Sequence, residues 1–496
     1  MDVIMLRNKT VFWTLGLGLL LIMALLGSRY VQGNDSSELE IEDPLLPDFI
    51  TQPSFGDYAQ MEERQMIRAL VVFGRADFFM DQGHMTGLQV ELLGHFETFI
   101  NKGKATRDRV RIKYIPVTFD QLIPALQDGR GDIAAAFLSP TPERAKLVSL
   151  IPGLINDVDE ILVSHSSNTE VTTWDSLKGK EIVVLKNSSY AENIERVNKD
   201  LGFWSFDKIK MREGDSEFAS EDLLEFVNEG IIDFTVIDSY KAELWQKVLP
   251  NIQLHPDIFL SKGNSLGWAV RQESIELKEK IEAFIQSEVK PGSLLGNMLI
   301  KRYYESTSWV KKAISSSERD RLNRLMPIFE KYAQQYNFDP LVLVAQAYQE
   351  SGLNNDLVSD RGAVGVMQLL PSTGAEMGIK DLSNVDQNIK AGAKYMSWLR
   401  EYHLSDYELA PNEQLAFNWA IYNAGPGRLK TILKKTEELG LDPTKWFGNV
   451  ELATAQIIGQ ETVKYVANNF KYYAAYRFIL ELEQQKSEST QELAEN

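Results

Sequence analysis

The sequence predicts two folded regions of different class, an α/β domain over residues 66–300 and a mainly helical domain over residues 301–480. Strand-like and helix-like hydrophobic patterns alternate through the first region, which is typical of α/β folds with open sheets. After Arg302 the apolar residues recur only at helical spacing. A chain of 496 residues is also long enough for two or three domains.

The N-terminus carries the pattern of an export signal. Arg7 and Lys9 precede an apolar run over residues 11–27, which predicts a secretory signal peptide over residues 1–33 with cleavage after Gly33. The run is close to the shortest length that spans a membrane, so a retained anchor is the alternative. Residues 34–65 are acidic, contain proline and lack periodicity, which predicts a linker.

The composition excludes several classes of protein. A net charge of −18 argues against nucleic acid or anionic lipid as the main partner. The chain has no cysteine, which excludes disulfides, thiolate metal sites, a cysteine nucleophile and a lipid anchor on cysteine. Its five histidines form no HExxH pattern, so we expect no metal and no cofactor.

The α/β region is predicted to contain at least five strands and two helices. The strands cover residues 69–73, 110–117, 132–137, 181–185 and 234–237, and the helices cover residues 87–99 and 119–127.

Three segments of this region, 87–92, 131–133 and 141–144, resemble periplasmic solute-binding proteins of the amino-acid-binding family. The resemblance implies two lobes with a ligand between them. Arg144 matches the family arginine that grips the ligand α-carboxylate, for which a planar guanidinium is suited. Asp238 matches the carboxylate that holds the ligand ammonium, and Ser188 and Ser189 lie where the second lobe meets the ligand. The family segment Asp-Phe-Ser-x-Pro-Tyr is replaced by Ser-Leu-Ile-Pro-Gly-Leu over residues 149–154, which leaves the ligand open.

The second region is predicted to be helical up to a polar end. Its helices cover residues 326–336, 341–351, 385–400, 413–423 and 453–476. Residues 481–496 are polar and predict a disordered tail.

Glu350 is the candidate catalytic residue of the helical region. Asp339 is a good helix N-cap, Pro340 suits the first helical position, and Gly352 ends the helix. Glu350 therefore lies in the last turn, away from the apolar face. The negative end of the helix dipole and nearby apolar side chains would raise its pKa, as a general acid near neutral pH requires.

Three further motifs follow Glu350-Ser351. They are Gly-Val-Met-Gln over residues 365–368, Tyr-Asn-Ala-Gly over residues 422–425, and Glu461-Thr462 with Tyr465-Val466. This order resembles the soluble-lytic-transglycosylase catalytic domain of the lysozyme superfamily, although Val463 stands where that family has arginine. The resemblance implies that Glu350 is the acid and base. It also implies that six residues position the sugars: Ser351, Met367, Gln368, Tyr422, Asn423 and Tyr465.

The combination of the two regions resembles membrane-bound lytic murein transglycosylases. The resemblance implies cleavage of the β-1,4 bond between N-acetylmuramic acid and N-acetylglucosamine in peptidoglycan strands, with a 1,6-anhydro product. It also implies a muropeptide, stem peptide or amino acid at the N-terminal domain, and peripheral attachment to the outer membrane in the periplasm. Two alternatives are a muramidase on the same fold, with Asp356 or Asp360 as a second carboxylate, and a non-catalytic wall-binding sensor.

Overall fold

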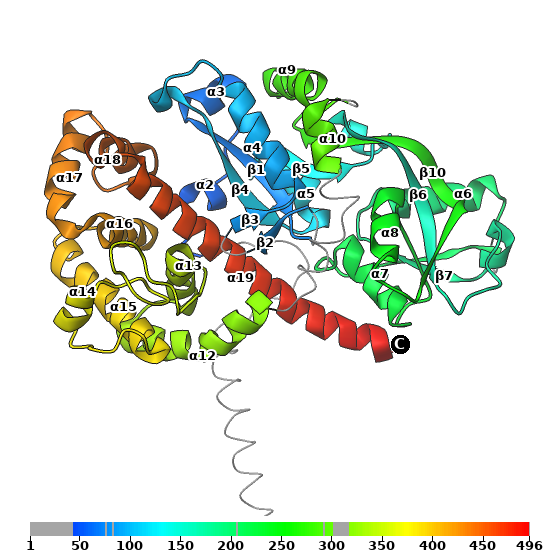
Figure 1. The fold of residues 1–496 in the computed structure, drawn as a ribbon. Helices are drawn as coiled ribbons and strands as arrows, with labels where there is room; N and C mark the ends of the chain where they lie inside the picture. The colour runs from blue at the N-terminus through cyan, green and yellow to red at the C-terminus, as the bar shows by residue number, and fades with distance from the viewer. Residues whose placement is uncertain are drawn as a thin grey trace, which may run out of the picture. The chain divides into compact units, whose positions relative to one another are not determined.

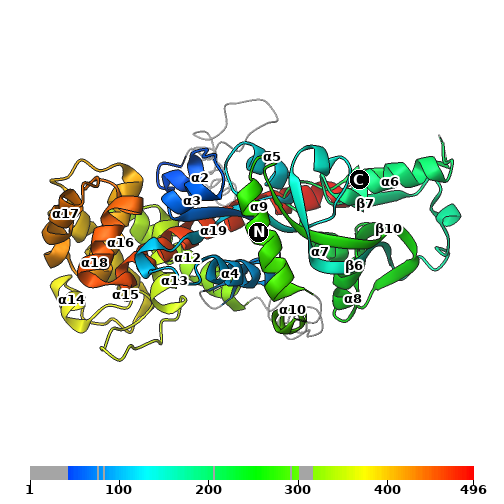
Figure 2. The same cartoon turned by 90° about the horizontal axis from the view of Figure 1, so that it is seen from above.

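The structure, a computed structural model, describes residues 43–74, 77–81, 84–204, 207–290, 293–300 and 317–495. Figure 1 and Figure 2 show strands and helices in the first part of the chain and helices in the second. The predicted signal peptide over residues 1–33 lies outside the described residues. Within the described ranges, no helix is both long enough and apolar enough to cross a membrane.

Residues 43–65 differ from the predicted linker. They contain helices α2 (Asp48–Thr51) and α3 (Tyr58–Glu63), and α3 begins with a capping box between Asp57 and Gln60. Four apolar side chains of this segment are buried: Leu46, Ile50, Tyr58 and Met61. These few apolar residues pack an otherwise polar segment against the domain. The polar composition of the segment therefore predicted a linker although the segment is folded.

A mixed sheet of eight strands organises the α/β region. Its order is β4-β1-β5-β10-β6-β9-β7-β8. The strands are β1 (Met66–Val72), β4 (Arg111–Val117), β5 (Ile133–Leu138), β6 (Ser149–His165), β7 (Glu181–Val184), β8 (Lys210–Glu213), β9 (Phe234–Asp238) and β10 (Ile252–Val270). A separate hairpin pairs β2 (Phe79–Asp81) with β3 (His84–Thr86). The five predicted strands correspond to β1, β4, β5, β7 and β9.

Two long antiparallel strands, β6 and β10, divide this sheet into two lobes. They have 17 and 19 residues and pair with each other along their length, with several register shifts. On one side β1 pairs in parallel with β4 and β5, and on the other β7 pairs in parallel with β8 and β9. The predicted two-lobed α/β fold is therefore confirmed, with β6 and β10 passing through both lobes.

Helices flank the sheet in both lobes (Figure 1). The first lobe has α4 (Leu88–Ile100), α5 (Leu122–Gln127), α9 (Ile275–Phe284) and α10 (Leu294–Ile300); the second has α6 (Ser189–Asp200), α7 (Ser220–Asn228) and α8 (Ser239–Gln246). Short helical turns cover Thr106–Asp108, Phe119–Gln121, Arg144–Lys146, Trp174–Leu177 and Ile285–Val289.

The C-terminal region is helical, as predicted. Its helices are α12 (Ser317–Tyr336), α13 (Pro340–Ser351), α14 (Pro371–Glu376), α15 (Val385–Leu399), α16 (Pro411–Ala424), α17 (Leu429–Glu438), α18 (Glu451–Ile458) and α19 (Gln460–Glu495). Short turns cover Arg400–Leu404, Pro426–Arg428 and Trp446–Val450. Helix α13 lies at the centre: the residues from Val342 to Tyr348 are all buried, because α12 and α19 both pack against it.

The last predicted helix, 453–476, is two helices in the structure. Gly459 adopts a φ of +92° between α18 and α19, a conformation that glycine adopts without steric cost. Helix α19 then continues to Glu495, through most of the predicted disordered tail. Along this length it leaves the helical core. Ala475 belongs to the hydrophobic core of the first lobe, and Lys486 pairs with Asp222 of α7 in the second lobe.

Candidate functional site

Glu350 lies where the sequence predicts, in the last turn of α13. The side chain of Asp339 accepts a hydrogen bond from the Leu341 amide at 2.7 Å, which caps the start of the helix. Gly352 ends the helix in the left-handed conformation, at a φ of +61°. The N-cap at Asp339 and the helix end at Gly352 together define the last helical turn, which carries Glu350.

The partners of the Glu350 carboxyl are neutral donors. The Tyr465 hydroxyl donates to Glu350 Oε1 at 2.5 Å, and Gln346 Nε2 lies 3.4 Å from the same oxygen. Gln346 Nε2 also donates to the Tyr465 hydroxyl at 2.6 Å, which orients that hydroxyl toward the carboxyl. Burial raises the pKa of Glu350 from 4.5 to about 7, and the hydrogen bond from Tyr465 opposes part of that rise. Near neutral pH this carboxyl can therefore both give and accept a proton.

The Gly-Val-Met-Gln segment is tied to α13 by Ser351. Its hydroxyl donates to the carbonyl oxygen of Val366 at 2.8 Å and accepts from the Asn354 amide at 3.1 Å. These contacts make Ser351 a link between the Glu350 helix and the loop that faces it.

A buried asparagine, Asn388 of α15, holds the other side of the same loop. Its amide donates to the carbonyl oxygen of Val364 at 2.8 Å, and its Oδ1 accepts from the Met367 amide at 2.8 Å. Gly365 has a φ of +81°, and a Cβ there would lie 2.2 Å from Asn388 Nδ2. The glycine of the motif is thus required by a positive φ and by the close approach of Asn388.

Of the two central motif residues, Met367 acts through its backbone carbonyl and Gln368 through its side-chain amide. Met367 is fully buried, and its carbonyl oxygen accepts from the Tyr422 hydroxyl at 2.8 Å. Gln368 has a φ of +46°. Its side-chain Nε2 donates to the carbonyl oxygens of Leu357 and Gly365, at 3.0 and 2.9 Å. Both residues shape the loop opposite Glu350.

The last two motifs meet at the start of α19. Thr462 donates to Asn423 Oδ1 at 2.7 Å, which joins the end of α16 to α19. Tyr465, one turn further along α19, reaches Glu350. The structure therefore brings all the predicted catalytic and sugar-site residues into one region around Glu350.

Asp356 and Asp360 lie apart from this arrangement. Both are exposed in the loop between α13 and α14, and no hydrogen bond or ion pair with Glu350 is described for either carboxylate. The described hydrogen bond at Asp356 is a backbone one, from its amide to Asn354 Oδ1 at 3.1 Å.

Sequence reasoning missed Gln346 and Asn388. Gln346 precedes Glu350 by four residues, so helical spacing alone places both side chains on one face, and this signal could have found it. Asn388 could not be found in this way, because the loop it holds lies more than twenty residues earlier in the chain.

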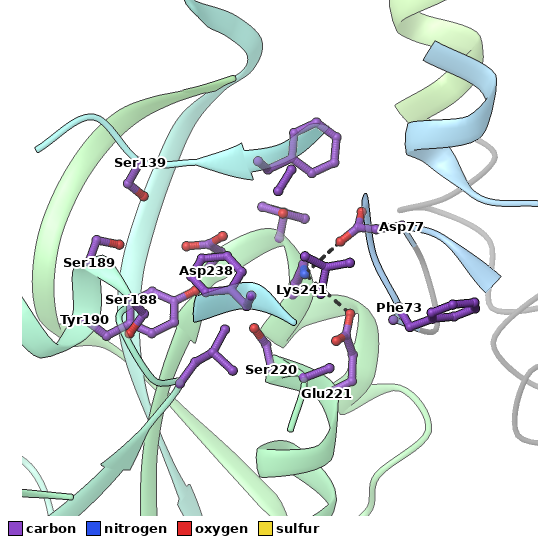
Figure 3. A pocket seen from close by; sticks show the side chains of 18 of the residues that line it. Phe73, Asp77, Ser139, Ser188, Ser189, Tyr190, Ser220, Glu221, Asp238 and Lys241 are labelled. Carbon is purple, nitrogen blue, oxygen red and sulfur yellow. Dashed lines mark hydrogen bonds and ion pairs between the residues drawn. The ribbon is translucent and has the colours of Figure 1, made fainter. Parts of the chain in front are cut away.

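A second candidate site lies in the α/β region, in a cavity of about 50 Å³ between the two lobes (Figure 3). All four residues predicted for a ligand line it: Arg144, Ser188, Ser189 and Asp238. The cavity is also lined by Asp77, Glu221 and Lys241, which the sequence analysis did not identify.

Arg144 is buried at one side of the cavity. Its guanidinium donates to the carbonyl oxygens of Ser139 and Asn187, both at 3.1 Å, and lies 5.9 Å from the centre of the Phe119 ring. Ser139 precedes Arg144 in the first lobe, and Asn187 belongs to the second. Arg144 therefore contacts both lobes.

Asp238 ends strand β9 inside the cavity. Burial, together with the negative charge of Glu160, raises its pKa from 3.8 to about 7. Glu160 is fully buried and accepts hydrogen bonds from Ser189 and Asn193, both at 2.6 Å. Ser188 Oγ has no hydrogen-bond partner among the described residues.

Lys241 joins the lobes across the cavity. Its ammonium lies 3.0 Å from Asp77 Oδ2 of the first lobe and 3.4 Å from Glu221 Oε1 of the second (Figure 3). Lys241 follows Asp238 by three residues at the start of α8, so helical spacing could have placed the two on one face.

Two family models match the two regions of the chain. Residues 75–304 match the family described as bacterial extracellular solute-binding proteins, family 3. Residues 327–444 match the family described as Transglycosylase SLT domain.

Several curated proteins are similar over most of the chain. A protein of Pseudomonas fluorescens strain Pf-5 named membrane-bound lytic murein transglycosylase F is 28% identical over 436 residues, covering 84% of this chain and 85% of that protein. A protein of the same name from Desulfosudis oleivorans is 28% identical, covering 72% of this chain and 79% of its own length. Another from Ectopseudomonas mendocina is 29% identical and covers 88% of both.

Several solved structures match about half of this chain. An ancestral arginine-binding protein bound to arginine covers 48% of this chain and 98% of its own, with 23% identity and a TM-score of 0.40. A putative L-cystine ABC transporter from Listeria monocytogenes covers 49% and 97%, with 20% identity and a TM-score of 0.42. From the family matches, the chain carries a solute-binding domain of family 3 followed by a transglycosylase SLT domain.

Proposed function

We propose that this chain is a peptidoglycan lytic transglycosylase that cleaves the β-1,4 bond between N-acetylmuramic acid and N-acetylglucosamine. The observation that carries the proposal is the Glu350 carboxyl, which is half-buried, has a pKa of about 7 and is held by neutral donors. The names of the similar proteins support the same reaction class.

The proposed reaction uses Glu350 twice. The protonated carboxyl first gives its proton to the oxygen that leaves C1 of the muramic acid. The resulting carboxylate then takes the proton of the 6-hydroxyl of the same sugar, whose oxygen bonds to C1 and closes a 1,6-anhydro ring. No water enters the product. A nucleophile held within the substrate has a large effective-concentration advantage over water, on the order of 10⁵ M or more in well-oriented systems.

The other motif residues are proposed to shape the sugar site. Tyr465 and Gln346 orient the carboxyl, while Ser351 and Asn388 hold the loop that carries Met367 and Gln368. Tyr422 and Asn423 fix the end of α16 beside it. The contacts of these groups support a site whose geometry is set before the glycan arrives.

A muramidase is the competing reaction on this fold. It would need a second carboxylate to activate a water molecule. Asp356 and Asp360 are the candidates, and their exposure in the loop supports the transglycosylase instead. A non-catalytic wall-binding sensor would have no use for a half-buried carboxyl of raised pKa.

The solute-binding domain is proposed to regulate the enzyme through a muropeptide, stem peptide or amino acid. Helix α19 supports a physical route. Tyr465 near its start bonds Glu350, and Lys486 near its end pairs with Asp222 of α7. The neighbouring residue of α7, Glu221, lines the ligand cavity. A ligand that shifts α7 would thus bias the position of Tyr465, by as much as its affinity differs between the two states.

We propose that the protein acts in the periplasm after export by its N-terminal signal. Peripheral attachment to the inner face of the outer membrane is the proposed location, and a retained N-terminal anchor would place it at the inner membrane instead.

Digestion of purified peptidoglycan sacculi tests the catalytic proposal. The purified chain should release soluble muropeptides, and failure to release any would overturn the proposal. Regulation is tested in the same assay by adding muropeptides to the wild type and to Lys486→Ala. They should change the rate of the wild type more than that of the variant, and an equal change in both would reject the route through α19.

A further inference from the structure

Charged groups of both signs line the ligand cavity. Arg144 offers the buried guanidinium at one part of the wall. In Figure 3, Asp238 lies between Ser188 and Ser189 on one side and Lys241 on the other. Asp77 lies beyond Lys241. The cavity therefore presents two acidic groups, Asp238 and Asp77, with Lys241 between them, and Arg144 elsewhere in its wall.

Asp238 and Asp77 each have a carboxyl oxygen that lacks a hydrogen-bond donor. Asp238 Oδ1 and Asp77 Oδ1 are buried and have no hydrogen-bond partner among the described residues. A buried carboxylate oxygen left without a donor is costly, so each is a place where a ligand N–H would be favourable. One such group on the ligand would satisfy Asp238, and a second would satisfy Asp77.

Lys241 already supplies a cation at the second place. Its side chain is only 12% exposed, and it lies between Asp77 and Glu221 at 3.0 and 3.4 Å. It extends from α8 of the second lobe to an acidic residue of the first. A primary ammonium of the protein thus stands where the cation of a ligand side chain would stand.

The charge of the cavity favours a cationic ligand. Its described lining has three carboxyl groups, Asp77, Glu221 and Asp238, against two cations, Arg144 and Lys241. The fully buried Glu160 adds a further negative charge close to Asp238. A ligand with a second carboxylate would meet these groups at short range, where like charges repel strongly.

We propose that the cavity selects a basic amino acid, whose side-chain cation displaces Lys241 from Asp77. The inference deepens the proposed regulatory role of this domain and rests on it. The α-carboxylate lies against Arg144 and the α-ammonium against Asp238. A cavity of about 50 Å³ is too small for a whole amino acid, so the lobes must part and the Lys241 side chain must move for the ligand to enter.

Isothermal titration calorimetry on the full chain tests this with matched pairs of ligands. L-arginine is compared with L-citrulline, and L-lysine with L-norleucine; each pair differs mainly in the side-chain charge. L-glutamate tests a side chain of the opposite charge. The basic ligands should bind about 10- to 100-fold more tightly than their neutral partners, because each gains one charge-assisted hydrogen bond.

Two variants locate the selectivity. Asp77→Asn should bring the arginine-to-citrulline ratio close to one. Lys241→Met removes the competing cation and should tighten arginine binding several-fold. Lys262→Met, at an exposed lysine of β10 that does not line the cavity, is the matched control and should bind as the wild type. Circular dichroism checks the fold, and Lys241→Gln replaces Lys241→Met where the latter fails to fold.

Equal binding of arginine and citrulline would overturn the inference. So would tighter binding of glutamate, or weaker arginine binding in the folded Lys241 variant. Absence of binding by all five amino acids would overturn it together with the amino-acid role of the domain. In that last case, release of muropeptides from sacculi would still support the catalytic proposal, so the two failures are distinguishable.

Discussion

Two carboxyl groups, the half-buried Glu350 in the helical domain and the buried Asp238 in the solute-binding domain, both have a pKa of about 7. The main cause is the same, the removal of the carboxyl from water. Their neighbours differ. Glu350 is surrounded by neutral donors, Tyr465 and Gln346. Asp238 feels the charges of Glu160 and Lys241.

A raised pKa therefore does not by itself identify a catalytic acid. Neutral donors stabilise Glu350 in both protonation states, so its proton can leave and return within one reaction. Asp238 lies in a field of fixed charges that a cationic ligand would change. Its proton is expected to leave when such a ligand binds.

The largest expected effect is on turnover. Glu350→Gln keeps the shape of the side chain but removes the proton that is given and recovered. Release of muropeptides from sacculi should fall by about 10²-fold or more. The measurement is the initial rate at pH 7, with binding to sacculi retained as a check on the fold.

Asp356→Asn and Asp360→Asn are the matched controls for that variant. Both carboxylates are exposed in the loop after α13. Each variant should keep turnover near the wild-type rate. A loss in either as large as that of Glu350→Gln would favour the muramidase.

The same variant should stabilise the protein. The folded pKa of Glu350, about 7, lies above the usual 4.5, so the folded state binds more protons between these values. The free energy of unfolding of the wild type is therefore highest below pH 4.5, as far as this group contributes, and falls as the pH rises to 7. Glutamine has no such loss. At pH 8 Glu350→Gln should be more stable by up to about 3 kcal/mol.

Thermal unfolding at two pH values measures this difference. The melting temperature of Glu350→Gln should exceed that of the wild type at pH 8, and the two should converge near pH 4. If the variant were less stable at both pH values, ionisation of the Glu350 carboxyl would not destabilise the folded protein.

Tyr465→Phe sharpens the comparison by removing a neutral donor. The hydrogen bond from Tyr465 lowers the pKa of Glu350, so the variant should have a higher pKa. The fall in kcat/KM above neutral pH should move to higher pH, and the rate at pH 7 should drop about tenfold. Tyr402→Phe, at a tyrosine that is 72% exposed, is the control. If the pH profile of the variant did not shift, the hydrogen bond from Tyr465 would not control the pKa of Glu350.

The smallest effect is a fraction of a proton at Asp238. At pH 7 this carboxyl is about half protonated, and an ammonium beside it would favour the carboxylate. Binding of L-arginine should therefore release about half a proton. Titrations in buffers of different ionisation enthalpy measure the release. It should persist in Glu350→Gln, and an enthalpy independent of the buffer would contradict it.

The sequence made the catalytic site easier to predict than the ligand cavity. Asp339, Pro340 and Gly352 define one helix locally, so the position of Glu350 follows from neighbours in the chain. The resemblance added the other motifs. Asn388 stayed hidden because the loop it holds is distant in sequence and its own helix shows no motif.

The fold could be predicted where a strand is short and lies within a single lobe. Strands β1, β5 and β9 are short and mostly apolar, and they were found. Strands β6 and β10 were not, because they run through both lobes, change register several times and contain Pro152 and Pro256. Lys241 was missed for a related reason, since its partner Asp77 lies in the other lobe.

The chemical form of the new chain ends tests the central claim most directly, that one carboxyl serves as acid and base with no water. Sacculi digested by the wild type are analysed by mass spectrometry before and after treatment with borohydride. The products should be muropeptides ending in 1,6-anhydro-N-acetylmuramic acid, lighter by one water than hydrolysis products and unchanged by borohydride. Products that borohydride reduces would contradict it and identify the enzyme as a muramidase.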